Sequence, residues 1–173
     1  MVQSRLVAIQ MDPIDAVDID ADSTFRLAEE AQARGHRLLY YTPDRLAYRA
    51  GRLVAHGHRL TVRRTQGDHA QLGPMEEIDL AACDVVLLRQ DPPFDMGYIT
   101  TTHLLQRLEP DTVVVNAPFW VRNYPEKLLV LDFPELTPPT LITRDLAELR
   151  AFKDRYGDIV VKPLYGNGGA GVF

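Results

Sequence analysis

Residues 158–173 read Asp-Ile-Val-Val-Lys-Pro-Leu-Tyr-Gly-Asn-Gly-Gly-Ala-Gly-Val-Phe, an apolar run with one lysine followed by a glycine-dense loop. The β-branched residues 159–161 predict a buried strand, which Pro163 ends because proline has no N–H for a β-ladder. Alternation puts Lys162 on the same face as Val160, at the carboxyl end of this strand, where α/β sheets usually hold ligands. The glycines that follow can bring backbone N–H groups close to an anion. The stretch therefore favours a lysine-assisted polyphosphate site.

Two well-known nucleotide loops do not fit this stretch. A Walker loop has its lysine after the glycines and before a Ser or Thr, whereas Lys162 precedes the glycines. The dinucleotide fingerprint needs its glycines between a strand and the start of a helix. A flexible hairpin turn with a partly exposed lysine would use as many glycines, so this alternative stays open beside the phosphate-binding loop.

Lysine is scarce in this chain. The 19 basic residues comprise sixteen arginines and three lysines, namely Lys127, Lys153 and Lys162. A lysine in so arginine-rich a chain marks a place where a compact, flexible point charge is wanted. Lys153 lies on an expected amphipathic helix, so a position on the surface explains it. No such position explains Lys127 and Lys162.

Composition narrows the class of protein. The 173 residues allow one domain plus part of another, and the net charge of -5 argues against nucleic acid as the main partner. No apolar stretch is long enough to span a bilayer and no signal-peptide pattern begins the chain, so we expect no membrane partner. The single cysteine, Cys83, fits a reducing cytoplasm and is expected to be a small buried residue.

The hydrophobic pattern predicts an α/β fold with a parallel sheet and right-handed crossovers. Strands are expected at residues 5–11, 37–42, 84–89 and 113–116, and helices at 25–34 and 98–108. Short antiparallel strands are expected within residues 43–67, and a loop at 66–74. After a connector at 117–123 we expect a helix at 125–131, a strand at 140–143, a helix from Asp145 to Tyr156, and the strand of the opening stretch.

Polar side chains gather where two expected strands end. Asp12 follows the first strand, and Arg89, Asp91 and Asp95 surround the two prolines of the loop after strand 84–89. A stiff loop that presents a guanidinium and carboxylates suits a zwitterionic, amino-acid-like ligand. The alternative is an Arg–Asp pair that satisfies itself and only shapes the turn. His56 and His58 would share a strand face, but with no third ligand they do not indicate zinc.

The quoted stretch also ends on an apolar pair. Val172 and Phe173 would begin a strand that has no partner downstream. From this we expect a fragment cut within the second of two domains.

Taken together, five motifs resemble the bacterial glutathione synthetase family. They are Met-Asp-Pro-Ile at residues 11–14, Leu-Arg-Gln-Asp-Pro-Pro-Phe-Asp at 88–95, Asn-Tyr-Pro-Glu-Lys-Leu at 123–128, Leu-Thr-Pro at 136–138, and Val-Lys-Pro-Leu-Tyr-Gly-Asn-Gly-Gly at 161–169. The 88–95 motif is the most specific, whereas the lysine and glycine motif is shared with other ATP-grasp ligases. The resemblance implies a Rossmann-like, pre-ATP-grasp substrate-binding domain at residues 1–122 and the beginning of an ATP-grasp domain at 123–173.

The resemblance also implies an activity. The family ligates γ-glutamylcysteine to glycine with ATP and Mg²⁺ through an acyl phosphate, in the cytoplasm and as a homo-oligomer that is a tetramer in relatives. Within this chain it implies two sets of binding residues and neither a catalytic residue nor a metal ligand. The ATP-binding set is Lys127, Lys162, Gly166, Asn167, Gly168 and Gly169, and the set for γ-glutamylcysteine is Arg89, Asp91, Asp12 and Ser23.

Some features depart from the family pattern. Gln90 stands where a lysine is common in relatives. The family's metal ligands lie in a carboxyl-terminal half that this chain lacks, so the fragment alone is expected to be inactive. Another ATP-grasp carboxylate–amine ligase and a non-catalytic module that binds a small ligand are the alternatives.

Overall fold

The computed structural model describes residues 3–166 and 168–173 and divides the chain into two compact units. Unit 1 is Met1–Asn123 and unit 2 is Tyr124–Phe173. Each unit is described by itself below.

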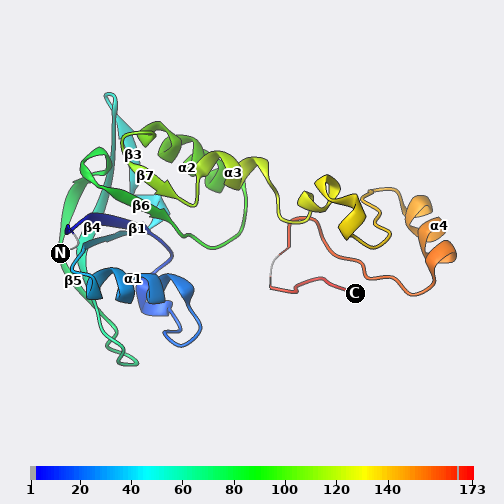
Figure 1. The fold of residues 1–173 in the computed structure, drawn as a ribbon, viewed down its shortest axis with the longest axis horizontal. Coiled ribbons are helices and arrows are strands. Elements are labelled where there is room, and N and C mark those ends of the chain that lie inside the picture. The colour runs from blue at the N-terminus through cyan, green and yellow to red at the C-terminus, as the bar shows by residue number, and fades with distance from the viewer. Residues whose placement is uncertain (1–2, 167) are drawn as a thin grey trace. The chain divides into compact units, whose positions relative to one another are not determined.

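Unit 1 is built on a seven-stranded mixed sheet (Figure 1). Its parallel part has the order β2-β1-β6-β7, from the strands β1 (Leu6–Gln10), β2 (Arg37–Tyr41), β6 (Val85–Leu88) and β7 (Val113–Val115). This confirms the expected parallel sheet. The strands are rich in Val and Leu because a parallel sheet covered on both faces buries most of their side chains, although Val113 and Val115 of the edge strand β7 are exposed.

An antiparallel extension continues the sheet beyond β2. The long strand β4 (Arg52–Val62) pairs with β2 and with β3 (Leu46–Arg49), and β5 (Ala70–Asp79) also pairs with β4. The expectation of antiparallel strands here is confirmed. The loop expected at residues 66–74 is found only at residues 66–69, because β5 already begins at Ala70. Most of the β5 side chains are exposed, so the strand lacks the apolar alternation that identifies a half-buried strand in a sequence.

Helices lie on both faces of the parallel strands. Helix α1 (Ser23–Ala33) packs Phe25 and Ala28 with Ile9 on one face. Helix α2 (Met96–Leu105) packs Leu105 with Ala8 on the other, and Figure 1 shows the two helices on opposite sides of the sheet. Both helices were expected, and both begin at an aspartate that caps the first turn.

The connector between the expected domains is itself helical. Helix α3 (Pro118–Asn123) packs against α2, and the Asn123 side chain donates to the Phe119 carbonyl at 2.8 Å instead of capping a following helix. The helix expected at 125–131 is wrong: one turn after Pro125 leads into a short 3₁₀ segment at Leu129–Asp132. Pro134 opens a further 3₁₀ turn at Pro134–Leu136, so no regular α-helix runs through this stretch.

Unit 2 contains helix α4 (Leu146–Tyr156), which confirms the expected helix and its caps. Asp145 accepts from the Ala147 N–H at 2.7 Å, and Gly157 ends the helix with a φ of 78°. The strands expected at 140–143 and 159–162 are not found in the described residues. Val161 and Phe173 exchange two backbone hydrogen bonds, each of 2.9 Å. Since no described side chain of unit 2 is fully buried, these apolar runs have no packed face to stabilise them as strands.

Candidate functional sites

Arg89 lies at the carboxyl end of the parallel strands of unit 1. Its backbone N–H donates to the Gln10 carbonyl at 2.8 Å, which extends the β1–β6 ladder by one bond. The guanidinium group donates to the hydroxyl of Ser23 at 2.7 Å and to that of Thr24 at 3.0 Å. Because these residues form the first turn of α1, the helix holds Arg89 at this edge of the sheet.

Asp12 and Asp91 meet at the same edge. Asp12 follows β1, and its Oδ2 accepts from the backbone N–H of Asp91 at 2.6 Å. Asp95 does not join them, because it caps α2 by accepting from the Tyr98 N–H at 2.9 Å. The structure therefore brings Asp12 to Asp91, and Arg89 to Ser23, among the residues expected to bind substrate.

The guanidinium group of Arg89 forms no ion pair in the described part of the chain. In residues 3–166 and 168–173, no ion pair joins Arg89 to a carboxylate, and its described side-chain partners are two neutral hydroxyls. The self-satisfied Arg–Asp pair that the sequence left open is therefore not formed by the described side chains. A positive group that is positioned but not neutralised can bind the carboxylate of a ligand.

Sequence reasoning overlooked three residues near this loop. Thr24 is the second hydroxyl that holds Arg89, and its only signal was its place beside Ser23. Fully buried Gln10 donates to the Gln90 side chain at 2.6 Å. Tyr98 donates to the Gln90 carbonyl at 3.4 Å.

Tyr98 is electrostatically connected to the same groups. Burial raises the pKa of its hydroxyl, while the positive charge of Arg89 lowers that pKa and the carboxylates of Asp91 and Asp12 raise it. Half-buried Tyr98 therefore keeps its proton, and its hydroxyl remains a donor near the two strand ends.

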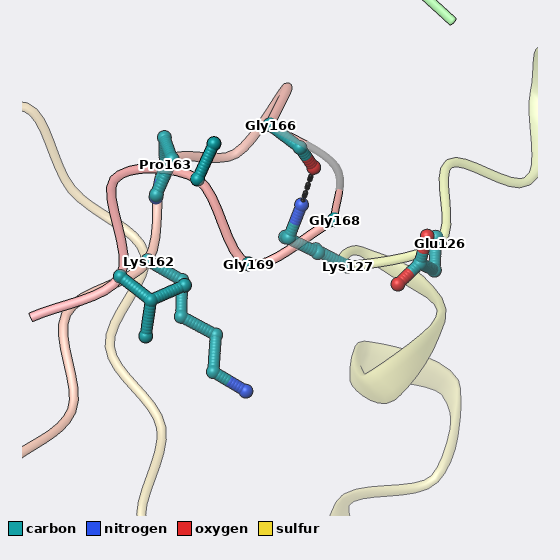
Figure 2. Close-up of a pocket in the computed structure, with 9 residues that line it drawn as sticks. Glu126, Lys127, Lys162, Pro163, Gly166, Gly168 and Gly169 are labelled. Carbon is teal, nitrogen blue, oxygen red and sulfur yellow. Dashed lines mark hydrogen bonds between the residues drawn. The ribbon is translucent and has the colours of Figure 1, made fainter. Parts of the chain in front are cut away.

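Unit 2 holds a pocket of about 230 Å³ between the turn after Pro125 and the glycine loop (Figure 2). Lys127 donates from its ammonium group to the Gly166 carbonyl, which joins the two segments. Lys162 is exposed, and no described residue forms a hydrogen bond or ion pair with its ammonium group. The lining residues are Glu126, Lys127, Lys162, Pro163, Gly166, Gly168, Gly169, Ala170 and Val172.

Backbone geometry explains glycine at two positions of this loop. Gly169 has a φ of 77°, a conformation that other residues rarely adopt. At Gly166, an added Cβ would lie 2.7 Å from the Pro163 Cγ, so a side chain would force the loop to move. Asn167, which the sequence suggested as a further ATP-binding residue, lies outside the described residues.

Comparison with known families identifies the chain. The family model described as "Prokaryotic glutathione synthetase, N-terminal domain" matches residues 6–122. The chain belongs to this family. A second model, "Prokaryotic glutathione synthetase, ATP-grasp domain", matches residues 126–173. These matches confirm the family resemblance and the α/β class with a pre-ATP-grasp domain followed by ATP-grasp sequence.

Curated relatives of the glutathione synthetase family match along the same length. The glutathione synthetase of Agrobacterium fabrum is 54% identical over 173 residues, covering 100% of this chain and 54% of the relative. That of Bradyrhizobium diazoefficiens is 59% identical over 167 residues, 96% of this chain and 53% of the relative. That of Salmonella typhimurium is 42% identical over 168 residues, 96% of this chain and 53% of the relative. The chain thus spans about half the length of these curated relatives.

Other chemistry-bearing residues have local partners. Cys83 is buried, as expected, and burial raises the pKa of its thiol to about 11. His58 Nδ1 lies 2.8 Å from the Gly73 carbonyl oxygen, and His56 Nε2 lies 4.0 Å from a Glu77 carboxylate oxygen. Across residues 3–166 and 168–173, no three His, Cys, Asp or Glu side chains are grouped to hold a metal ion. The helices in the same ranges are too short or too polar to cross a membrane.

Proposed function

We propose that this chain supplies the dipeptide-binding and phosphate-binding parts of a glutathione synthetase. The reaction is the ATP-dependent ligation of γ-glutamylcysteine to glycine, giving glutathione, ADP and phosphate. In this proposal residues 1–122 form the substrate-binding domain and residues 123–173 begin the ATP-grasp domain. Family membership and the two clusters of polar groups support it.

The main support for this function is that Ser23 and Thr24 hold the Arg89 guanidinium without neutralising its charge. A planar guanidinium with free donor capacity suits a carboxylate of γ-glutamylcysteine. Asp12 and Asp91, joined at the same strand ends, would then face the positively charged amino group of the dipeptide. The opposite signs of charge match those of a zwitterionic peptide.

The pocket of unit 2 has groups that fit a polyphosphate. Lys127 and Lys162 would neutralise charge on the phosphates, and the backbone of Gly166, Gly168 and Gly169 would approach them closely. Phosphate oxygens would replace the Gly166 carbonyl as the acceptor for Lys127. Asn167 belongs to the same proposed loop.

The chemistry has two steps in this proposal. A carboxylate oxygen of the dipeptide attacks the terminal phosphorus of ATP, and ADP leaves. The glycine amine then attacks the carbonyl carbon of the acyl phosphate, loses a proton, and phosphate leaves. The lysines reduce the repulsion between the carboxylate and the phosphates, while the glycine loop shields the acyl phosphate from water.

Mg²⁺ accompanies ATP in the proposal, but the described residues do not fit a metal site, since none of their acidic or imidazole groups form a set of three. No step is therefore assigned to the metal. A cytoplasmic location and a homo-oligomer complete the proposal. The first is supported by a reaction that uses ATP and a reduced thiol, and the second by the family resemblance alone.

The test is ADP release by the protein at its full encoded length, with ATP, Mg²⁺, γ-glutamylcysteine and glycine. We expect release that requires both γ-glutamylcysteine and glycine. Release with another carboxylate in place of γ-glutamylcysteine would point to a different ATP-grasp ligase. Binding of γ-glutamylcysteine without any ADP release would point to a binding module. Sedimentation of the same sample measures the oligomeric state.

A further inference from the structure

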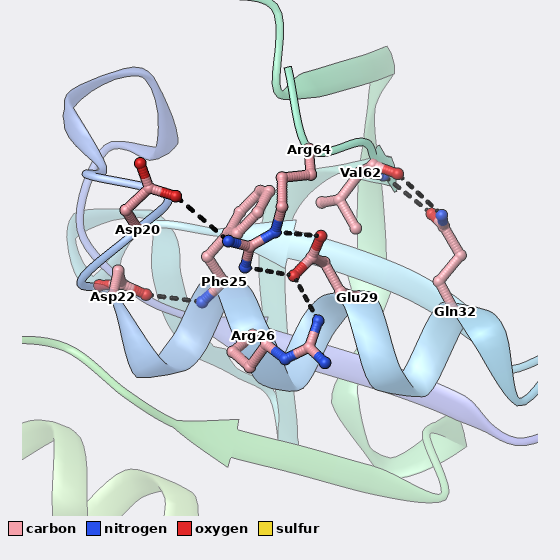
Figure 3. Close-up of polar contacts among 8 residues, drawn as sticks. All are labelled: Asp20, Asp22, Phe25, Arg26, Glu29, Gln32, Val62 and Arg64. Atoms are coloured by element: carbon pink, nitrogen blue, oxygen red, sulfur yellow. Dashed lines mark hydrogen bonds and ion pairs between the residues drawn. The ribbon is translucent and has the colours of Figure 1, made fainter. Parts of the chain in front are cut away.

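Helix α1 is fastened to the end of β4 by a side-chain amide (Figure 3). The Gln32 Nε2 donates to the Val62 carbonyl at 2.8 Å, and the Val62 N–H donates to the Gln32 Oε1 at 2.8 Å. The amide thus satisfies both backbone groups of Val62, as a neighbouring strand would. This attachment fixes the second half of α1 relative to the sheet.

Arg64 adds a second attachment two residues further along the chain. Its Nε and Nη2 donate to the two Glu29 oxygens at 3.1 and 2.8 Å, and its Nη1 donates to Asp20 at 3.2 Å. Arg26 donates to the same Glu29 carboxylate at 3.0 Å. Figure 3 shows Arg64 between the loop before α1 and the middle of the helix. A two-pronged pair within a network restrains its partners more than an isolated surface pair.

The electrostatics of Glu29 agree with this geometry. Its side chain is only 15% exposed. The hydrogen bonds from Arg64, and after them the bond from Arg26, lower the Glu29 pKa to about 2, although burial raises it. Glu29 is therefore a carboxylate that stays ionised between its two arginines.

The amino end of the same helix holds Arg89. Asp22 caps α1 by accepting from the Phe25 N–H at 2.6 Å, and Ser23 and Thr24 accept from Arg89. Any shift or tilt of α1 would move both hydroxyls. The network around Glu29 is thus mechanically connected to the guanidinium group through a single helix.

A nearby pair offers a comparison. Arg34 donates to Glu30 at 2.7 Å, but both residues belong to α1 or its carboxyl cap, so the pair attaches the helix to nothing else. Arg64 comes from beyond β4, and its pair with Glu29 joins two elements of the fold.

We propose that Arg64 is a positioning residue for Arg89: by fixing α1, it sets how tightly Arg89 binds the dipeptide carboxylate. The proposal rests on the proposed function for the identity of that ligand. Arg64 touches neither the ligand nor the reacting atoms. A purely structural role would instead lower stability without changing the affinity of the folded protein for the dipeptide.

The experiment uses the protein at its full encoded length with Arg64→Ala, Arg64→Lys and the matched control Arg34→Ala. For Arg64→Ala we expect the KM for γ-glutamylcysteine to rise about fivefold, with kcat and the KM for ATP within about twofold of the parent. The KM of Arg64→Lys for γ-glutamylcysteine should lie between those of the parent and Arg64→Ala, because an ammonium group cannot bind both Glu29 oxygens as a planar guanidinium does. Arg34→Ala should match the parent.

A second measurement does not depend on turnover. The side-chain Nε–H signal of Arg89, assigned by its loss in Arg89→Lys, should shift or broaden in Arg64→Ala and remain in place in Arg34→Ala. If the KM and this signal are unchanged in a folded Arg64→Ala protein, the proposal is overturned. If Arg64→Ala does not fold, Arg64→Lys and Glu29→Gln must each raise the KM for γ-glutamylcysteine selectively, or the proposal fails.

The two proposals fail differently. A parent protein that does not use γ-glutamylcysteine would refute the proposed function, while the Arg89 signal would still report on its coupling to Arg64. A parent that uses the dipeptide, with no selective effect of Arg64, would refute the positioning role alone.

Discussion

The Asp12 carboxylate accepts a hydrogen bond from the backbone N–H of Asp91 at 2.6 Å, across 79 residues of sequence. The bond joins the segments that follow two neighbouring parallel strands, β1 and β6. It therefore fixes the start of the proline-containing loop whose first residues follow Arg89.

Removing this acceptor should free the amide of Asp91. In Asp12→Ala, we expect the Asp91 N–H to exchange with solvent about tenfold faster than in the parent, since a hydrogen bond to a charged group contributes on the order of 1 kcal/mol or more. Asp12→Asn keeps an oxygen acceptor but removes its charge, so its exchange rate should lie between those of the parent and Asp12→Ala. Amide exchange followed by NMR measures both, with exposed Asp15→Ala as the control. Equal exchange in all variants would mean that the bond does not restrain the loop.

Arg89 should require its planar fork as well as its charge. Arg89→Lys retains the charge but cannot reach Ser23 and Thr24 with the same geometry, so the affinity for γ-glutamylcysteine should fall about tenfold. Calorimetric titration of the protein at its full encoded length measures this loss. Arg59→Lys, at an exposed ion pair with Glu76, controls for the general effect of the substitution. Unchanged affinity in Arg89→Lys would remove Arg89 from the dipeptide site.

The sequence predicts the edge of the sheet at which these residues meet, but not their pairing. Strand β6 is a continuous apolar run and β1 is apolar up to Gln10. Parallel strands bring their carboxyl ends together, so Asp12 and Arg89 were expected there. The contact between Arg89 and Ser23 depends on how α1 packs on the sheet, which spacing along the chain does not encode. Asp95 was expected beside Arg89 and Asp91 because the sequence does not distinguish an aspartate that caps a helix from one that binds a ligand. In the structure Asp95 caps α2.

Unit 2 was predicted less accurately for a physical reason. The apolar residues 159–161 have strand propensity, but a strand needs a ladder and a face to bury, and Val160 is 69% exposed. Helix α4 was predicted correctly because its capping aspartate and terminal glycine are local signals.

Stability should decrease in acid as Glu29 is protonated. Its pKa is lowered in the folded protein from an ordinary 4.5 to about 2, so folding favours the ionised form. The resulting stabilisation is complete above about pH 4.5, falls as the pH decreases toward 2, and is absent below pH 2. Urea unfolding at a series of pH values should show a shallower acid slope for Glu29→Gln than for the parent. If Glu30→Gln, the control on the same helix, flattens the slope equally, Glu29 is not its source.

The three lysines should differ in their contribution to ATP binding. Lys127→Met and Lys162→Met remove charges that line the pocket, and each should weaken ATP binding about tenfold. Lys153→Met changes an exposed residue of α4 outside the pocket and should bind ATP like the parent. Titration with a non-hydrolysable ATP analogue measures these affinities. A similar loss in all three variants would indicate a nonspecific effect of charge.

The glycine loop should tolerate no side chain at Gly166. An alanine Cβ there would lie 2.7 Å from the Pro163 Cγ and 3.3 Å from the Ala170 carbonyl oxygen, so the loop would have to move away from the pocket. Because Lys127 donates to the Gly166 carbonyl, the shift would also displace that ammonium group. We expect ATP affinity to fall about tenfold in Gly166→Ala, since misplaced binding groups lose most of their contribution. Gly73→Ala, whose Cβ would come no closer than 3.4 Å to its neighbours, is the matched control. If both alanine variants bind ATP like the parent, the nucleotide does not depend on this loop.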